Sequence, residues 1–126
     1  MVVLIMLVQR VIYPSFLYAE KSTFRTWHSM YTSRVTMVVM PLMLAQMFLA
    51  VWHLTREVNI YTIASMLIIV TLWGLTFLWA IPLHGKLDTE EDYLPYVRKL
   101  IQMNKYRTVL WVGEWLLMLC VLFILA

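Results

Sequence analysis

Charge is scarce in this chain, and that scarcity indicates its class. Charged residues make up 13% of the 126 positions and hydrophobic residues 63%, with a mean hydropathy of +0.78. Soluble domains carry about 25% charge and about 45–50% apolar residues. The composition is therefore typical of an integral membrane protein. The net charge of +3 is interpreted through the positive-inside rule, and no nucleic-acid partner is expected.

Glycine and cysteine are also rare, which excludes several kinds of site. The three glycines form neither a phosphate-binding loop nor a GxxxG packing motif. The single cysteine, Cys120, excludes a disulfide within the chain. Metal-ligand spacings such as CxxC or HxxxH are missing as well. The first residues lack the basic region and cleavage site of a signal peptide, so they are interpreted as part of the fold.

Four apolar segments are present, with polar stretches between them. They cover residues 1–18, 35–54, 60–83 and 108–126. A helix needs about 20 apolar residues to cross a membrane, and in lipid only helices or closed barrels satisfy the backbone. The first segment is the weakest, because Gln9, Arg10 and Pro14 interrupt it. The sequence predicts an all-α, four-transmembrane-helix bundle that forms one domain over residues 1–126.

The stretch after the third segment predicts a helix boundary of its own. Pro82 and Gly85 are expected to end the third helix, and Asp88 with Glu91 is typical of a helix start. Apolar residues then recur at helical spacing over residues 94–101. We therefore expect a long fourth helix that begins in the cytoplasm and continues through the membrane.

Basic residues divide unequally between the two sides of such a bundle. One side would carry the two long connections, with eight basic residues, and the other Arg56 alone. The positive-inside rule then places the long connections in the cytoplasm and both termini on the non-cytoplasmic side. The eight are Lys21, Arg25, Arg34, Lys86, Arg98, Lys99, Lys105 and Arg107.

Two charges fall inside apolar segments. Arg10 lies about 14 Å along the first helix from its start, and Glu114 lies about 18 Å from the end of the last helix. Because the first helix would start and the last helix would end at the same, non-cytoplasmic face, these depths are similar. We therefore expect an intramembrane ion pair between Arg10 and Glu114, because a buried charge without its partner is costly.

A polar stripe leads into the last apolar segment. Asn104, Arg107 and Glu114 share one face of a helix, while His28 and His84 flank the cytoplasmic ends of the second and third helices. One interpretation is a cytoplasm-facing pocket, in which the guanidinium and amide hold an oxyanion and a histidine acts as base. The other is that these side chains only reach toward the membrane interface.

The two histidines leave a further alternative open. His28 and His84 at one level could ligate a metal ion or haem, although no ligand spacing supports this. Aromatic residues crowd the same boundary, where an aromatic belt accounts for most of them. A flat organic substrate stacked among them is the alternative. The cofactor is otherwise unassigned.

Several motifs of the chain together resemble a known family. The stretches "YPSF", "FRTWHSMYTSRVTMVVMPLML", "IPLHGKLD" and "LIQMNKYRTVLW" resemble the anthrone-oxygenase-like family of small four-helix integral membrane proteins, most of unknown function. The most specific part is Pro82 followed by Asn104, Arg107 and Thr108 before the last span. The resemblance implies oxidation of an activated polyphenolic ring by O₂ without an evident cofactor. It further implies that Asn104 and Arg107 bind the substrate oxyanion and that His28 or His84 is the base.

Two functions of different classes follow. The first is an oxygenase-like enzyme that acts on a small aromatic or lipophilic substrate in a pocket formed by the four residues. The alternative is a non-catalytic protein of the bilayer, either an accessory subunit of a larger complex or homo-oligomer, or a small-molecule or haem-binding protein. The enzyme requires His28, His84, Asn104 and Arg107 to converge, whereas the alternative allows them to disperse.

Overall fold

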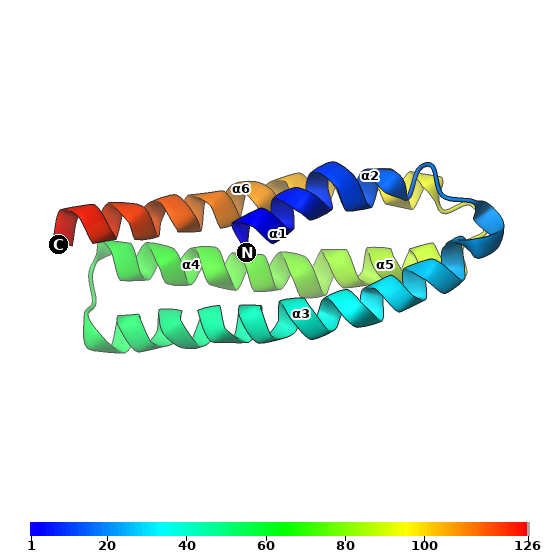
Figure 1. Cartoon of the computed structure of the whole chain (residues 1–126). Coiled ribbons are helices and arrows are strands. Elements are labelled where there is room, and N and C mark those ends of the chain that lie inside the picture. Colours follow the sequence, from blue (N-terminus) through cyan, green and yellow to red (C-terminus); the bar gives the residue numbers. More distant parts are fainter. Residues whose placement is uncertain (126) are drawn as a thin grey trace.

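The computed structural model describes residues 1–125, which form helices and no strand, so the predicted all-α class is confirmed (Figure 1). Two of the elements, η1 and η2, are π-helical turns inside longer helical segments. In chain order the elements are α1 (Val2–Leu7), η1 (Val8–Ile12), α2 (Tyr13–Ser15), α3 (Lys21–Arg56), α4 (Ile60–Leu75), η2 (Thr76–Ala80), α5 (Ile81–Thr89) and α6 (Leu94–Leu125).

Three helical segments are long and apolar enough to cross a membrane, which indicates a membrane protein. They are Lys21–Arg56, Ile60–Thr89 and Leu94–Ile124, and their most apolar windows have mean hydropathies of 2.0, 2.1 and 1.8. The second consists of α4, η2 and α5 in one continuous rod. The amino-terminal segment, Val2–Ser15, is apolar but shorter.

The helices pack in sequence around an open seam. Helix α3 packs on the rod of α4 and α5, the rod packs on α6, and α6 packs on α1 and α2. Within residues 1–125 the backbones of α1 and α3 do not approach each other. The amino terminus lies about halfway along the bundle, while α6 continues to its far end (Figure 1). The seam between α1 and α3 is therefore not closed by helix packing.

Helix α3 is longer than the sequence predicted. The polar residues of the connection, which were expected to separate two helices, form its first turns from Lys21 onward. This stretch contains neither glycine nor proline, and it buries Phe24 and His28, four residues apart on one face. A helix of 36 residues is about 54 Å long, which exceeds the roughly 30 Å hydrocarbon core. Its amino-terminal turns can therefore extend beyond the core.

The predicted end of the third helix at Pro82 and Gly85 is wrong. The rod continues through α5 to Thr89, and Pro82 lies in the first turn of α5, directly after the wider turn η2. Pro14 follows η1 in the same way. A π-helical turn changes the local hydrogen-bond pattern, and in both places it accommodates a proline that cannot donate a backbone hydrogen bond.

The predicted helix start at Asp88 is also wrong. Asp88 belongs to α5, and α6 begins at Leu94. Pro95 thus lies in the first turn of α6, where proline is tolerated because the missing N–H would have no partner. The carboxylate of Asp88 is used for a contact with α3, as described below.

Two clusters of buried side chains hold the helices together. The one near the α5–α6 connection is rich in aromatic rings, and Phe24 stacks on Tyr93 with ring centroids 4.0 Å apart. Burial raises the pKa of Tyr93, so this phenol stays neutral in the packing. The other cluster contains Met43, Ile69, Leu72 and Trp111 and joins α3, α4 and α6.

We expect Leu72→Ala to lower the free energy of unfolding by about 1–3 kcal/mol. Leu72 is fully buried, and between membrane helices the loss of packing, rather than transfer from water, is the dominant cost. Leu67→Ala on the same helix is the matched control, because Leu67 is 63% exposed. Unfolding in mixed micelles measures both. Equal losses in the two variants would contradict this packing arrangement.

Candidate functional site: a hydrogen-bonded relay beside a cavity

A cavity of about 290 Å³ lies in the seam between α1 and α3, with η2, α5 and α6 behind it. Most of its wall is apolar, with side chains such as Leu4, Ile5, Val39 and Met43. Among residues 1–125, the ionisable side chains that line it are Tyr13, Tyr31, His84 and Arg107. The volume is at the small end of ligand pockets, about 300–1,000 Å³. The cavity therefore suits a small molecule with one polar end.

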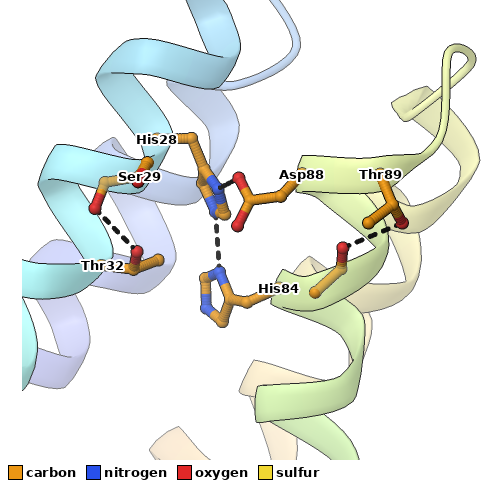
Figure 2. Close-up of polar contacts among 7 residues, drawn as sticks. His28, Ser29, Thr32, His84, Asp88 and Thr89 are labelled. Atoms are coloured by element: carbon orange, nitrogen blue, oxygen red, sulfur yellow. Dashed lines mark hydrogen bonds and ion pairs between the residues drawn. The ribbon is translucent and has the colours of Figure 1, made fainter.

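A chain of four side chains reaches this cavity from the surface. Asp88 Oδ1 lies 2.7 Å from His28 Nδ1, His28 Nε2 lies 2.8 Å from His84 Nδ1, and His84 Nε2 lies 3.0 Å from the Tyr13 hydroxyl. Figure 2 shows His28 between Asp88 and His84. The His28 side chain is fully buried, whereas 39% of the Asp88 side chain is exposed. The relay thus links a solvent-exposed carboxylate to the cavity.

Local structure explains why these groups meet. His84 and Asp88 are four residues apart on α5, so both face α3. His28 is four residues after Phe24 on the buried face of α3, and the two rings stack with centroids 5.4 Å apart. The ring of Phe16 lies nearly perpendicular to the same imidazole, with the ring centroids 5.4 Å apart. These aromatic contacts fix the plane of the His28 ring, so that its two nitrogens point at Asp88 and His84.

Arg107 approaches the relay from α6. Its guanidinium lies near Tyr13 and His84, and Asn104 Oδ1 accepts a hydrogen bond from Arg107 Nη1 at 3.1 Å. The amide of Asn104 in turn donates to Gln9 Oε1 at 2.9 Å. Asn104 is fully buried and Arg107 is 6% exposed. The guanidinium is therefore held in place by one neighbour on its own helix.

No carboxylate pairs with Arg107 among the described residues. The two ion pairs found there are His28–Asp88 and Lys86–Glu90, and the Nε of Arg107 has no hydrogen-bond partner. A buried guanidinium without a counter-ion is costly, and its planar donors suit an oxyanion. The polar end of the cavity therefore favours a ligand with an anionic or easily ionised oxygen.

The ends of the relay set the direction of its hydrogen bonds. A carboxylate can only accept and a guanidinium can only donate. If each histidine carries one proton, His28 donates through Nδ1 to Asp88, His84 donates through Nδ1 to His28, and the Tyr13 hydroxyl donates to His84 Nε2. The Tyr13 oxygen then remains free to accept on the side of Arg107. Within the relay each donor points toward Asp88, and each of the four side chains has its hydrogen-bond partners.

The four predicted site residues converge, but in two layers. His84 and Arg107 line the cavity, while His28 and Asn104 lie directly behind them and hold each in position. Sequence reasoning missed Tyr13, which was assigned to the aromatic belt. It also missed Asp88, whose spacing of four residues from His84 was the available signal.

The predicted ion pair between Arg10 and Glu114 is not formed. Arg10 is exposed and lies beside Lys105 on the outer surface, whereas Glu114 is buried and accepts a hydrogen bond from Ser65 Oγ at 2.5 Å. The two depths were counted from one membrane face. In the structure Met1 already lies at the level of Glu114, where both line one cavity. Arg10 therefore lies about 14 Å further along the bundle.

The histidines do not present a ligand set for metal or haem. All four ring nitrogens of His28 and His84 have hydrogen-bond partners within the relay. In the described part of the chain no group of three or more histidine, cysteine, aspartate or glutamate residues is placed to hold a metal ion. The geometry favours proton movement over metal ligation.

Comparisons with protein-family models, with curated proteins and with solved structures find no match to this chain. The resemblance to the anthrone-oxygenase-like family therefore rests on the short motifs alone, and the site has to be interpreted from its own geometry.

We expect both relay histidines to be protonated at Nδ1 and to lack a proton at Nε2. Long-range proton–nitrogen NMR spectra of protein with ¹⁵N-labelled histidine distinguish the two tautomers. The Tyr13→Phe variant removes the donor to His84 Nε2 and should shift that nitrogen most, while the exposed His53 serves as the unchanged reference. A proton on His84 Nε2 in the wild-type protein would reverse the direction of the relay and contradict it.

Proposed function

We propose that this protein is a small four-span membrane protein that binds a lipophilic molecule with an acidic hydroxyl and oxidises it in an oxygenase-like reaction. One observation carries the proposal. A buried guanidinium without a carboxylate partner lies near a Tyr–His–His–Asp relay, at the polar end of an otherwise apolar cavity. Ionisable side chains that converge on a cavity define a candidate reactive site.

The proposed orientation puts the relay at the cytoplasmic side. In this arrangement the segment Val2–Ser15 accompanies the three long helices as the first span. The basic residues gather at the end of the bundle where α3 begins and α5 connects to α6, which supports a cytoplasmic location by the positive-inside rule. Both termini would then be on the non-cytoplasmic side.

The bilayer supplies a route to the cavity in this proposal. The seam between α1 and α3 lacks helix contacts, so a lipophilic molecule could enter sideways from the hydrocarbon core. Its apolar part would rest against Val39 and Met43, and its hydroxyl would face Arg107. The volume suits a fused-ring compound better than a whole phospholipid.

The roles of the side chains follow from their places. Arg107 would hold the oxyanion of the ionised substrate, and Asn104 would orient the guanidinium. The Tyr13 oxygen would take the substrate proton while its own proton moves to His84. His28 and Asp88 would carry that charge to the surface, in line with the direction of the hydrogen bonds. Tyr13, His84 and Arg107 are the proposed catalytic residues, and His28 and Asn104 are positioning residues.

With an anthrone-type substrate the chemistry balances without a redox cofactor. Anthrone exchanges with its enol, and loss of the enol hydroxyl proton gives an enolate, whose ring carbon donates electrons to O₂ and forms a carbon–oxygen bond. The peroxide anion then takes up a proton and becomes a hydroperoxide. Loss of water from the resulting hydroperoxide leaves a carbonyl. One O₂ is reduced and one water is released for each CH₂ that becomes C=O.

One observation favours the non-catalytic alternative. Helix α3 buries only Phe24, His28, Met43 and Ala50, so most of its apolar surface is left for lipid or for another subunit. A protein that binds the same ligand without turning it over, or that acts within a complex, would use this surface.

We expect the wild-type protein in nanodiscs to accelerate the conversion of anthrone into anthraquinone, with one O₂ consumed per product. His84→Gln and Arg107→Gln should each lower the rate by about 10²-fold or more, because one loses the proton acceptor and the other the oxyanion partner. Arg98→Gln, at an exposed position of α6, is the matched control. Oxygen uptake and product absorbance measure the reaction.

Equal rates for wild type, His84→Gln and Arg107→Gln would contradict the enzyme. Binding of anthraquinone that depends on Arg107, without acceleration of the reaction, would support the non-catalytic binding protein instead. Equilibrium binding measured on the same nanodiscs separates these outcomes.

The orientation has its own test. In a Cys120→Ala background, Glu91→Cys should be labelled by an impermeant maleimide only from the cytoplasmic side, and Glu57→Cys only from the other side. Both glutamates are exposed and lie at opposite ends of the bundle. The reverse pattern would overturn the proposed orientation and leave the fold unchanged.

A further inference from the structure

A second cavity, of about 390 Å³, lies in the other half of the bundle, between the start of α1 and the helices α3, α4 and α6. It shares only Met1 with the lining of the first cavity. Its polar side chains come from three helices and include Gln46 from α3, Ser65 from α4 and Glu114 from α6, with His53 of α3 at the rim. It is therefore a separate site.

Two buried acceptors in this cavity have no partner. Glu114 is 8% exposed, and its Oε1 accepts from Ser65 at 2.5 Å. Its Oε2 and the Oε1 of Gln46 are buried without any hydrogen bond. Buried polar atoms are satisfied in the great majority of cases, so exceptions call for an explanation. Two unsatisfied oxygens therefore line the same cavity, together with one unsatisfied donor, the Nε1 of Trp111.

No cation of the described chain compensates Glu114. The ion pairs in residues 1–125 lie elsewhere, and Arg56 rests over the ring of Trp52, 4.7 Å from its centroid. Met1, with its terminal amino group, and the exposed His53 also line the cavity, and neither forms a salt bridge with Glu114. An ionisable group inside a membrane usually marks a functional site, and this one lacks its counter-ion.

The rest of the lining suits an organic cation. Trp111 and Trp115 contribute indole rings, and aromatic faces attract ammonium groups. Leu49, Ile69 and Met118 provide an apolar wall. The vacant acceptors call for a ligand with at least two N–H donors, and the apolar wall calls for a hydrocarbon part.

We propose that this cavity binds a primary ammonium group attached to an apolar chain. Glu114 is the counter-ion, Gln46 accepts a second N–H bond, and Ser65 holds the carboxylate in place. A free lipophilic amine and an aminophospholipid headgroup share this chemistry, and the experiments below distinguish them. The site uses none of the residues of the proposed reaction, so the two proposals can be tested independently.

Octylamine is the probe, and octanol is its neutral analogue. Wild-type protein in phosphatidylcholine nanodiscs, whose headgroups carry no N–H, should bind octylamine in a titration followed by calorimetry. Glu114→Gln should lower the affinity about tenfold or more, and Gln46→Leu should lower it less. Glu57→Gln, an exposed carboxylate at the same end of the bundle, should leave it unchanged.

A chemical readout checks the same site without relying on folding of a variant. Dicyclohexylcarbodiimide, which enters apolar phases, should modify Glu114 in the wild-type protein, and octylamine should slow that modification while octanol does not. Mass spectrometry of peptides locates the adduct. Competition by phosphatidylethanolamine would assign the ammonium to a lipid headgroup, and its failure to compete would assign it to a free amine.

Two results would overturn the proposal. One is equal protection of Glu114 by octylamine and octanol, which would make the cavity a general apolar site. The other is unchanged octylamine affinity in a folded Glu114→Gln protein, which would show that the carboxylate is not the counter-ion.

Discussion

The contact on which the site depends is the 2.8 Å hydrogen bond between His28 Nε2 and His84 Nδ1. It joins α3 to α5 inside a largely apolar bundle, at a place where an unpaired imidazole nitrogen would be costly. The other nitrogen of His28 bonds to Asp88, and the other nitrogen of His84 bonds to the Tyr13 hydroxyl. A buried polar network is stable when every member is satisfied, and this one is satisfied from the surface to the cavity wall.

Each of the two cavities is lined by a buried ionisable group that has no charged partner among the described residues. Because the backbones of α1 and α3 do not approach each other within residues 1–125, the first cavity lies in the seam between these two helices. A buried guanidinium at its polar end would be poorly compensated in an empty cavity, and an oxyanion would neutralise it. In the other half of the bundle, the carboxyl group of Glu114 likewise has no charged partner among the described residues, and an ammonium group would compensate it. The two halves thus present a buried guanidinium and a buried carboxyl group, each without a charged partner among the described residues, to separate cavities.

The sequence predicted the class of the fold better than the limits of its helices. Composition and apolar segments of membrane-spanning length were enough for an all-α membrane protein. The polar residues from Lys21 to Arg34 were interpreted as a connection, although they form the first turns of α3. In a sequence, charged residues at the exposed end of a helix cannot be distinguished from a polar loop. The π-helical turns before Pro14 and Pro82 let the helices continue where proline usually ends them.

Half of the site could be predicted in the same way. Helical spacing and similar depth grouped His28, His84, Asn104 and Arg107, of which His84 and Arg107 line the cavity while His28 and Asn104 lie behind them. Tyr13 was beyond reach, since its contact with His84 joins residues 71 positions apart and its type is common at membrane interfaces. The expected pairing of Arg10 with Glu114 failed for a related reason, because the depth of Arg10 depends on where the first helix begins in space.

The central claim is that Arg107 receives the ionised oxygen of a lipophilic ligand in the seam cavity. Solid-state NMR of the protein with ¹⁵N-labelled arginine and 1-naphthol labelled with ¹³C at the carbon that bears the oxygen measures this directly. The account predicts a carbon–nitrogen distance of about 4 Å that is lost in Arg107→Gln. Naphthol that contacts only lipid, or a contact that survives this substitution, would contradict it.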